Sequence, residues 1–293
     1  MTPTSPHDVA RHHVTAPANQ AGSIVVGAYL RHLRRRSRIL LRTAARVLDV
    51  HLATVQRIEW GLVPVSSSRA LALLRLYGVN DQPAHQRMVE LLGQLSPADG
   101  SLVDHCPGVL SRLAAVEEQA TAFRLYSLGR IPPSLQTAAY SEGLRWPRIS
   151  PDPLLEGRPF IQGAVSSRPV EVLLDEALLM RAVGGLDVLA GQLDYLATLA
   201  EQGAALVLVV PFTSGVMPPA VNLTSLRLPG PGRRHLTYIE SPLSIAYFAN
   251  HRGHQQALDE LRARAWSPAD SSSILRRAAA TAASGTAPTP ESW

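Results

Sequence analysis

Arginine is concentrated in one short part of this chain. Between residues 24 and 80 there are ten arginines and two acidic residues, a net charge of +8, whereas the rest of the chain contains 18 arginines and 21 acidic residues, a net charge of −3. The chain contains no lysine. GC-rich coding is the simpler explanation for that absence, although a guanidinium fork does pair well with phosphate and with guanine. The charge asymmetry itself indicates a nucleic-acid partner for this segment.

Side chains that could read or grip a duplex stand close together within this segment. Thr54 and Gln56 are candidates for base edges, since a glutamine amide can pair with adenine through two hydrogen bonds. Arg57 is a candidate phosphate contact, and His51 could either contact phosphate or cap a helix. Glu59 suits a structural role, holding a helix end or pairing with an arginine. The other expected contacts with DNA are Ala53, Arg31, Arg34, Arg35 and Arg42.

The apolar spacing around these residues predicts five short helices, at about residues 24–36, 40–48, 52–60, 69–77 and 83–95. Asp49 falls between the second and third helices, where a short polar residue tolerates an unusual backbone. Gly61 suits the position just after a helix. Two helices at this spacing predict a helix-turn-helix, which lays its second helix in the major groove of DNA.

The pattern changes to short apolar runs in the C-terminal part. These runs predict strands at residues 170–174, 205–210, 223–228, 236–240 and 245–248, and residues 122–126 could form another. Helices are expected at residues 176–183, 186–201 and 254–266, and Ser267-Pro268 with Asp270 signals the start of a last helix. The expected fold class is multi-domain: an all-α helix-turn-helix N-terminal domain followed by an α+β (α/β-like) domain with a sheet of about five strands.

Composition suggests the boundaries of these parts. We expect a disordered tail at residues 1–22, the helix-turn-helix domain at 23–95, a linker at 96–109, the α+β domain at 110–277 and a second disordered tail at 278–293. The N-terminus lacks the apolar stretch of a secretory signal, and no apolar run reaches the roughly 18 residues of a membrane span. A cytoplasmic protein is therefore expected.

Signals for catalysis or metal binding are weak. No Gly-rich phosphate loop or Gly-x-Ser-x-Gly elbow occurs, and the single Cys106 excludes an internal disulfide and Cys-rich zinc patterns. His251 and His254 lack a convincing third ligand, so an exposed pair at a helix start is the simpler interpretation. Residues 211–215 could border a pocket at the carboxyl end of the most apolar strand, or form a plain turn. We expect no enzyme, no cofactor and no metal.

The second and third expected helices carry a known residue pattern. The matching residues are Ala45, Leu48, Val50, Thr54, Val55, Arg57, Ile58, Glu59 and Gly61. The pattern resembles the Xre (Cro/repressor-type) helix-turn-helix family, which implies DNA binding. The chain departs from that family at Leu40 and Leu41, where Thr-Gln is common, and at residues 51–53, which replace polar residues that often read bases.

The C-terminal part matches a second pattern in order and spacing. Its pieces are residues 131–140 (IPPSLQTAAY), 174–178 (LDEAL), 183–185 (VGG), 192–196 (QLDYL) and 238–240 (YIE). Over about residues 110–280 the chain resembles the effector domain, often described as antitoxin-like, that follows Xre modules in many actinomycete regulators. Pro133 and Ser134 replace the usual Gly-Leu. The resemblance implies a transcriptional regulator that often acts with a small basic protein encoded by an adjacent gene.

Three functions remain open. The first is a DNA-binding transcriptional regulator whose C-terminal domain forms a homodimer or binds the small partner protein; a dimer would suit two half-sites about 34 Å apart. The second is an antitoxin-like protein-interaction module with weak or lost sequence readout, suggested by Leu40, Leu41, Leu52 and Ala53. The third is a small-molecule sensor, or an enzyme, carried by the C-terminal sheet.

Overall fold

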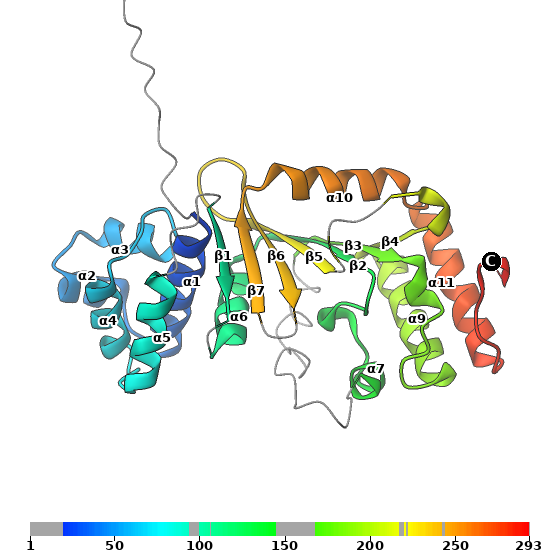
Figure 1. Ribbon diagram of the computed structural model, residues 1–293, viewed down its shortest axis with the longest axis horizontal. Coiled ribbons are helices and arrows are strands. Elements are labelled where there is room, and N and C mark those ends of the chain that lie inside the picture. The colour runs from blue at the N-terminus through cyan, green and yellow to red at the C-terminus, as the bar shows by residue number, and fades with distance from the viewer. Residues whose placement is uncertain are drawn as a thin grey trace, which may run out of the picture.

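A computed structural model describes residues 20–93, 100–105, 107–144, 168–216, 220, 222–241 and 244–292. Figure 1 shows the N-terminal helices at one end, a mixed sheet in the middle, and α9 (Leu186–Glu201) and α11 (Pro268–Ala283) at the opposite end. The multi-domain class with a helical part followed by an α+β part is thus confirmed. Most of the expected tail at residues 1–22 lies outside the described residues, and α1 begins at Gln20.

The helical part has the predicted helix-turn-helix. Asp49, with φ of 50°, takes the left-handed conformation after α2, and its amide and that of Val50 bond to carbonyls of the last turn of α2. The observed helices match the five predicted ones to within a few residues at each end: α1 (Gln20–Arg36), α2 (Leu41–Leu48), α3 (Leu52–Glu59), α4 (Ser67–Leu76) and α5 (Gln82–Gly93).

Glycine allows α1 and the end of α3 to come into backbone contact. A Cβ on Gly27 would lie 2.1 Å from the carbonyl oxygen of Ile58. A Cβ on Gly61, whose φ is +64°, would lie 2.4 Å from Cα of Ile24. No side chain fits at either position without moving the backbone, so these glycines fix how α3 sits on α1.

The C-terminal part contains a seven-stranded mixed sheet rather than about five strands. Its order is β1-β7-β6-β5-β2-β3-β4, with parallel pairs only between β2 and β3 and between β3 and β4. The strands are β1 (Ser101–Asp104), β2 (Ala122–Ser127), β3 (Val170–Asp175), β4 (Leu206–Val210), β5 (Asn222–Leu228), β6 (Arg234–Ser241) and β7 (Ser244–Ala249). Strand β1 lies within the segment expected to be a linker, and its pairing with β7 could not be foreseen from four residues near two prolines.

Along β2 to β6, residues on the two faces of the sheet enter two separate cores. In β3, Val172 and Leu174 face the main core, whereas Leu173 joins a smaller cluster under α10 (Arg252–Arg264). On the main-core side lie α6 (Val109–Gln119), α7 (Ala138–Gly143), α9 (Leu186–Glu201) and α11 (Pro268–Ala283). Figure 1 shows α10 along one face of the sheet and α6 and α9 on the other.

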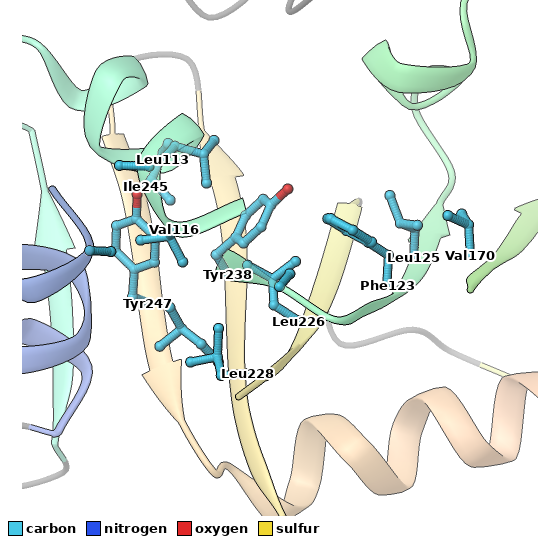
Figure 2. Close-up of a cluster of buried hydrophobic side chains, with 14 of the residues drawn as sticks. Leu113, Val116, Phe123, Leu125, Val170, Leu226, Leu228, Tyr238, Ile245 and Tyr247 are labelled. Atoms are coloured by element: carbon cyan, nitrogen blue, oxygen red, sulfur yellow. The ribbon is translucent and has the colours of Figure 1, made fainter. Parts of the chain in front are cut away.

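Aromatic residues fill the main core beneath α6. Figure 2 shows Leu113 and Val116 of α6 above Tyr238 and Tyr247, which come from adjacent strands β6 and β7. The two tyrosines are almost completely buried, and their rings lie 6.2 Å apart in a tilted arrangement. Burial of apolar side chains such as Leu113 and Val116, which are fully buried, contributes about 1.5–3 kcal/mol each. Helix α6 therefore joins the sheet firmly, and α1 packs against α6, β1 and β7.

Two other expectations for the C-terminal part need correction. The helix expected at residues 176–183 is only a 3-10 turn, Glu176–Leu179, capped by Asp175. The tail expected at 278–293 begins inside α11, whose Ala278 and Ala282 are fully buried, because small alanine side chains let α11 pack closely on α9. The predicted Ser267 cap of α11 is confirmed, since its hydroxyl accepts from the Asp270 amide. Among the described residues, no helix is both long and apolar enough to cross a membrane.

Candidate nucleic-acid interface

Helix α3 has one buried side and one side that is accessible to solvent. Val55 and Ile58 point into the core of the helical part and are buried. Ala53 and Arg57 are exposed, while Thr54 and Gln56 are partly exposed. The side chains predicted to meet DNA therefore lie on the accessible side of α3, and none of them is sealed beneath the fold.

Both ends of α3 are closed by local hydrogen bonds. His51 Nδ1 accepts from the amide of Ala53 at 3.2 Å, so His51 acts as the N-cap. This is one of the two roles that the sequence left open for His51, which is also exposed. At the other end the amide of Leu62 bonds to the carbonyl of Arg57, and Gly61 takes the left-handed conformation, which closes the helix as predicted.

Arg34 is not available to phosphate. Its Nε and Nη2 donate to the carboxylate of Glu59 at 2.6 and 2.9 Å, and its Nη1 donates to the carbonyl of Ile39 at 2.9 Å. The side chains of Arg34 and Glu59 are 14% and 3% exposed. The hydrogen bond with Glu59 raises the pKa of Arg34 further. Thus the structural role expected of Glu59 is confirmed, and the guanidinium group of Arg34 connects α1 to α3 and is not free to bind phosphate.

Arg31 and Arg35 also lie on the side of α1 that faces other parts of the protein. Arg35 Nη1 donates to Glu118 of α6 at 3.1 Å, and His32 Nδ1 lies 2.8 Å from the other oxygen of that carboxylate. Burial lowers the pKa of Arg31, which is partly buried near the same charges. The partly buried Arg31 has little surface left for a phosphate contact, whereas the Arg35 side chain is 56% exposed and stays accessible despite its bond to Glu118.

Exposed arginines remain on the other helices of this part. Arg42 lies in the first turn of α2 and Arg57 in the last turn of α3. Arg38, which has a left-handed φ of 56° between α1 and α2, and Arg69, in the first turn of α4, are exposed as well. Sequence reasoning selected Arg42 and Arg57 but omitted Arg38 and Arg69, although their charge alone could have signalled them.

Two large apolar side chains are exposed at the starts of α2 and α3. Leu40 is 53% exposed and Leu52 is 42% exposed. Leu40 occupies the N-cap position of α2 and offers no side-chain cap, in keeping with the departure noted in the sequence. An exposed leucine can contact a thymine methyl group or an apolar patch of a protein.

The hollows of the C-terminal part differ widely in volume. One along the starts of β2, β3 and β4, lined by residues that include Arg124, Arg168 and Glu171, has a volume of about 670 Å³, which is large enough for a small molecule. A much smaller cavity at the carboxyl end of β2, lined by residues that include Arg130, Ser134 and Glu240, has a volume of about 20 Å³, roughly the space of one water molecule. It does not include residues 211–215, which form a 3-10 turn whose Phe212 amide donates to Glu176. Of the two alternatives that the sequence left open for residues 211–215, the described positions form a turn.

The histidine pair at the start of α10 is a capping arrangement. His251 Nδ1 accepts from the amide of His254 at 3.2 Å, and the ring centroids lie 4.0 Å apart. His251 is exposed as expected, but His254 is only 8% exposed because Phe248 packs edge-on against it. Burial lowers the pKa of His254 to about 4. In the described part of the chain no three His, Cys, Asp or Glu side chains cluster as metal ligands; Cys106 lies outside the described residues.

Two family patterns match the chain in the same order as the two structural parts. Residues 25–88 match a helix-turn-helix domain, and residues 110–277 match a domain of unknown function (DUF5753). No curated protein and no solved structure matches the chain. The matches support a DNA-binding regulator for the helical part but assign no activity to the α+β part. Because the second match covers more than half of the 293 residues, the protein belongs to the DUF5753 family and carries a helix-turn-helix domain before that domain.

Proposed function

We propose that this protein is an Xre-type transcriptional regulator that inserts α3 into the major groove of duplex DNA. The observation that carries the proposal is the accessible surface of α3, where Ala53 and Arg57 are exposed beside the partly exposed Thr54 and Gln56. The net charge of +8 between residues 24 and 80 would attract the phosphate backbone. A helix of this kind presents its N-terminal residues to base edges.

The proposed contacts fall into two classes. Thr54 and Gln56 would read base edges, with Ala53 in apolar contact beside them. Arg57, Arg42 and the exposed His51 would bind phosphates and fix the register without specifying sequence. Arg34 is left out of this interface because Glu59 and Ile39 occupy its guanidinium group.

For the α+β part we propose a regulatory rather than an enzymatic role. It would mediate a homodimer or bind a small partner protein encoded by an adjacent gene, as the resemblance to antitoxin-like effector domains suggests. A dimer would favour two half-sites separated by about 34 Å. A regulator of this kind would act in the cytoplasm, where it meets DNA.

An electrophoretic mobility shift on the full chain tests the proposal. Duplexes would be selected from a random-sequence pool, and the dissociation constant measured at two salt concentrations for the wild type and Arg57→Ala. We expect Arg57→Ala to weaken binding to all duplexes and to reduce the salt slope by about one. Arg277→Ala, at an exposed position on α11, is the matched control and should change neither quantity. Binding by the wild type that ignores salt, or an Arg57→Ala variant that binds unchanged, would contradict the proposal.

The exposed Leu40 and Leu52 favour a second candidate, a protein-interaction module with weak sequence readout. In that case the wild type would enrich no sequence from the pool. It would instead co-purify with a defined small protein, and replacement of Leu40 and Leu52 by serine would abolish that co-purification. The same double variant should keep its DNA binding within about tenfold if the first candidate is right.

A further inference from the structure

The C-terminal end of α3 receives hydrogen bonds from the α+β part of the chain. Local bonds satisfy the carbonyls of α3 as far as Ile58. The next two carbonyls accept from distant side chains: that of Glu59 from Gln119 Nε2 at 3.2 Å, and that of Trp60 from Arg234 Nη2 at 2.8 Å. Helix ends normally leave such carbonyls to water or to local caps. Here two side chains far away in sequence supply the cap.

The surroundings of Arg234 suit it to this contact. It lies at the start of β6, is only 6% exposed, and also donates from Nη1 to the carbonyl of Pro229 at 2.9 Å. Gly230 makes room for it, since a Cβ there would lie 3.1 Å from Nη1. Burial lowers the pKa of Arg234, and its guanidinium group donates to the carbonyls of Pro229 and Trp60. Its positive charge meets the negative end of the α3 dipole.

Gln119 approaches α3 from another element. It is the last residue of α6, next to Glu118, which contacts His32 and Arg35 of α1. Helix α6 therefore contacts both α1 and the end of α3, while Arg234 at the start of β6 contacts the end of α3. Any shift of α6 or of the turn before β6 would be transmitted to α3 through these bonds.

We propose that Gln119 and Arg234 are positioning residues for DNA readout, through which the DUF5753 domain fixes the orientation of α3. This inference rests on the proposed function. Hydrogen bonds to base edges depend on the exact placement of donors and acceptors, whereas attraction to phosphate tolerates small shifts. Loss of the cap would therefore reduce selectivity for a sequence more than general affinity for DNA.

The first measurement needs no DNA. Hydrogen exchange of the full chain would follow the amides of Trp60, Gly61 and Leu62, which close the end of α3. Gln119→Ala and Arg234→Gln should each raise exchange at these amides at least several-fold, because the end of α3 frays more often. Arg233→Gln, an exposed neighbour that loses the same charge, should leave them unchanged. Unchanged exchange in both Gln119→Ala and Arg234→Gln would overturn the cap.

The second measurement compares two duplexes. One is a duplex of about 30 base pairs enriched by the wild type from a random pool, long enough for two half-sites, and the other is a scrambled duplex of the same composition. We expect the ratio of the two dissociation constants to fall about tenfold in Arg234→Gln, as for loss of one charged hydrogen bond. The salt slope should stay unchanged because phosphate contacts are kept. Arg233→Gln should keep the wild-type ratio.

The outcomes separate this inference from the proposed function. If the wild type enriches no duplex, the proposed function fails and the positioning role fails with it, even if the exchange experiment shows the cap. If the wild type is selective and Gln119→Ala and Arg234→Gln keep that selectivity, the positioning role alone is wrong. If Arg234→Gln does not fold, Gln119→Ala, at a partly exposed site, serves as the test by itself. A variant that binds the enriched and the scrambled duplex more weakly by the same factor would show a merely structural role for the replaced residue.

Discussion

Arg34 and Arg57 belong to the same helix-turn-helix region, but their guanidinium groups meet opposite environments. All three guanidinium nitrogens of Arg34 donate hydrogen bonds, two to the carboxylate of Glu59 and one to the carbonyl of Ile39, and its side chain is 14% exposed. Arg57, on α3, is exposed. The two residues are of one type and belong to helices in direct contact. Arg34 nevertheless connects α1 to α3, whereas Arg57 is accessible to a binding partner.

This difference shows that the net charge of a sequence segment overestimates the number of its arginines that are accessible to DNA. Part of the +8 between residues 24 and 80 is neutralised by carboxylates of the same chain: Glu59 pairs with Arg34, which is 14% exposed, and Glu118 pairs with Arg35, which is 56% exposed. The same division occurs elsewhere in the chain: Arg112 pairs with the fully buried Asp104 of β1 through two bonds of 2.6 and 2.7 Å. A buried arginine with a partner is a structural element, and only the exposed ones remain for phosphate.

The largest expected effect separates Arg34 from Arg57 by stability. Arg34→Ala should lower the free energy of unfolding by about 3–5 kcal/mol, because it leaves the carboxylate of Glu59 buried without its partner. Arg57→Ala should change it by less than about 0.5 kcal/mol. Urea denaturation measures both. Glu59→Gln and the double variant complete a mutant cycle, and a coupling energy near zero would show that the pair does not hold α1 to α3.

A smaller effect distinguishes the two histidines that begin α10. The pKa of His254 is lowered by burial from 6.5 to about 4, so between these pH values the unfolded chain binds a proton that the folded chain does not. Stability should therefore fall as the pH falls from about 6.5 to about 4, by at most about 1.4 kcal/mol per pH unit. Denaturation at a series of pH values measures the slope. His254→Leu should flatten it. The exposed capping variant His251→Asn should keep most of it, because burial is the larger cause of the lowered pKa of His254 and the charge of His251 the smaller. Equal slopes in the wild type and His254→Leu would contradict this assignment.

The sequence predicts the helical part well because its signals are local. Asp49 and Gly61 stand at the left-handed positions that end α2 and α3, and apolar residues three and four apart mark the buried faces. In the α+β part, β1 and α6 were not foreseen. Strand β1 has four residues and exists because it pairs with β7, more than 130 residues away.

In the candidate site, too, the features with a local sequence signal could be predicted and those that depend on long-range contacts could not. Exposure of α3 follows from its own periodicity, so Arg57 and Ala53 could be selected from the sequence. The pairing of Arg34 with Glu59 could be predicted only in part. The sequence indicates an arginine partner for Glu59 but does not identify which arginine it is. The contacts of Gln119 and Arg234 with α3 carry no local signal, since Trp60 and Arg234 are 174 positions apart. Such contacts depend on how the two parts of the chain dock.

The smallest expected effect on stability concerns Leu52, the exposed apolar residue in the first turn of α3. Leu52→Ser should change the free energy of unfolding by less than about 0.5 kcal/mol, since a side chain that is 42% exposed loses little contact. If α3 enters the major groove, the variant should nevertheless alter the base preference by about 1 kcal/mol at a single position, where a thymine methyl group would meet Leu52. Sequencing of the duplexes enriched by each protein measures this. A stable variant with the wild-type preference would place Leu52 outside the groove, and the readout would then rest on Thr54 and Gln56 without it.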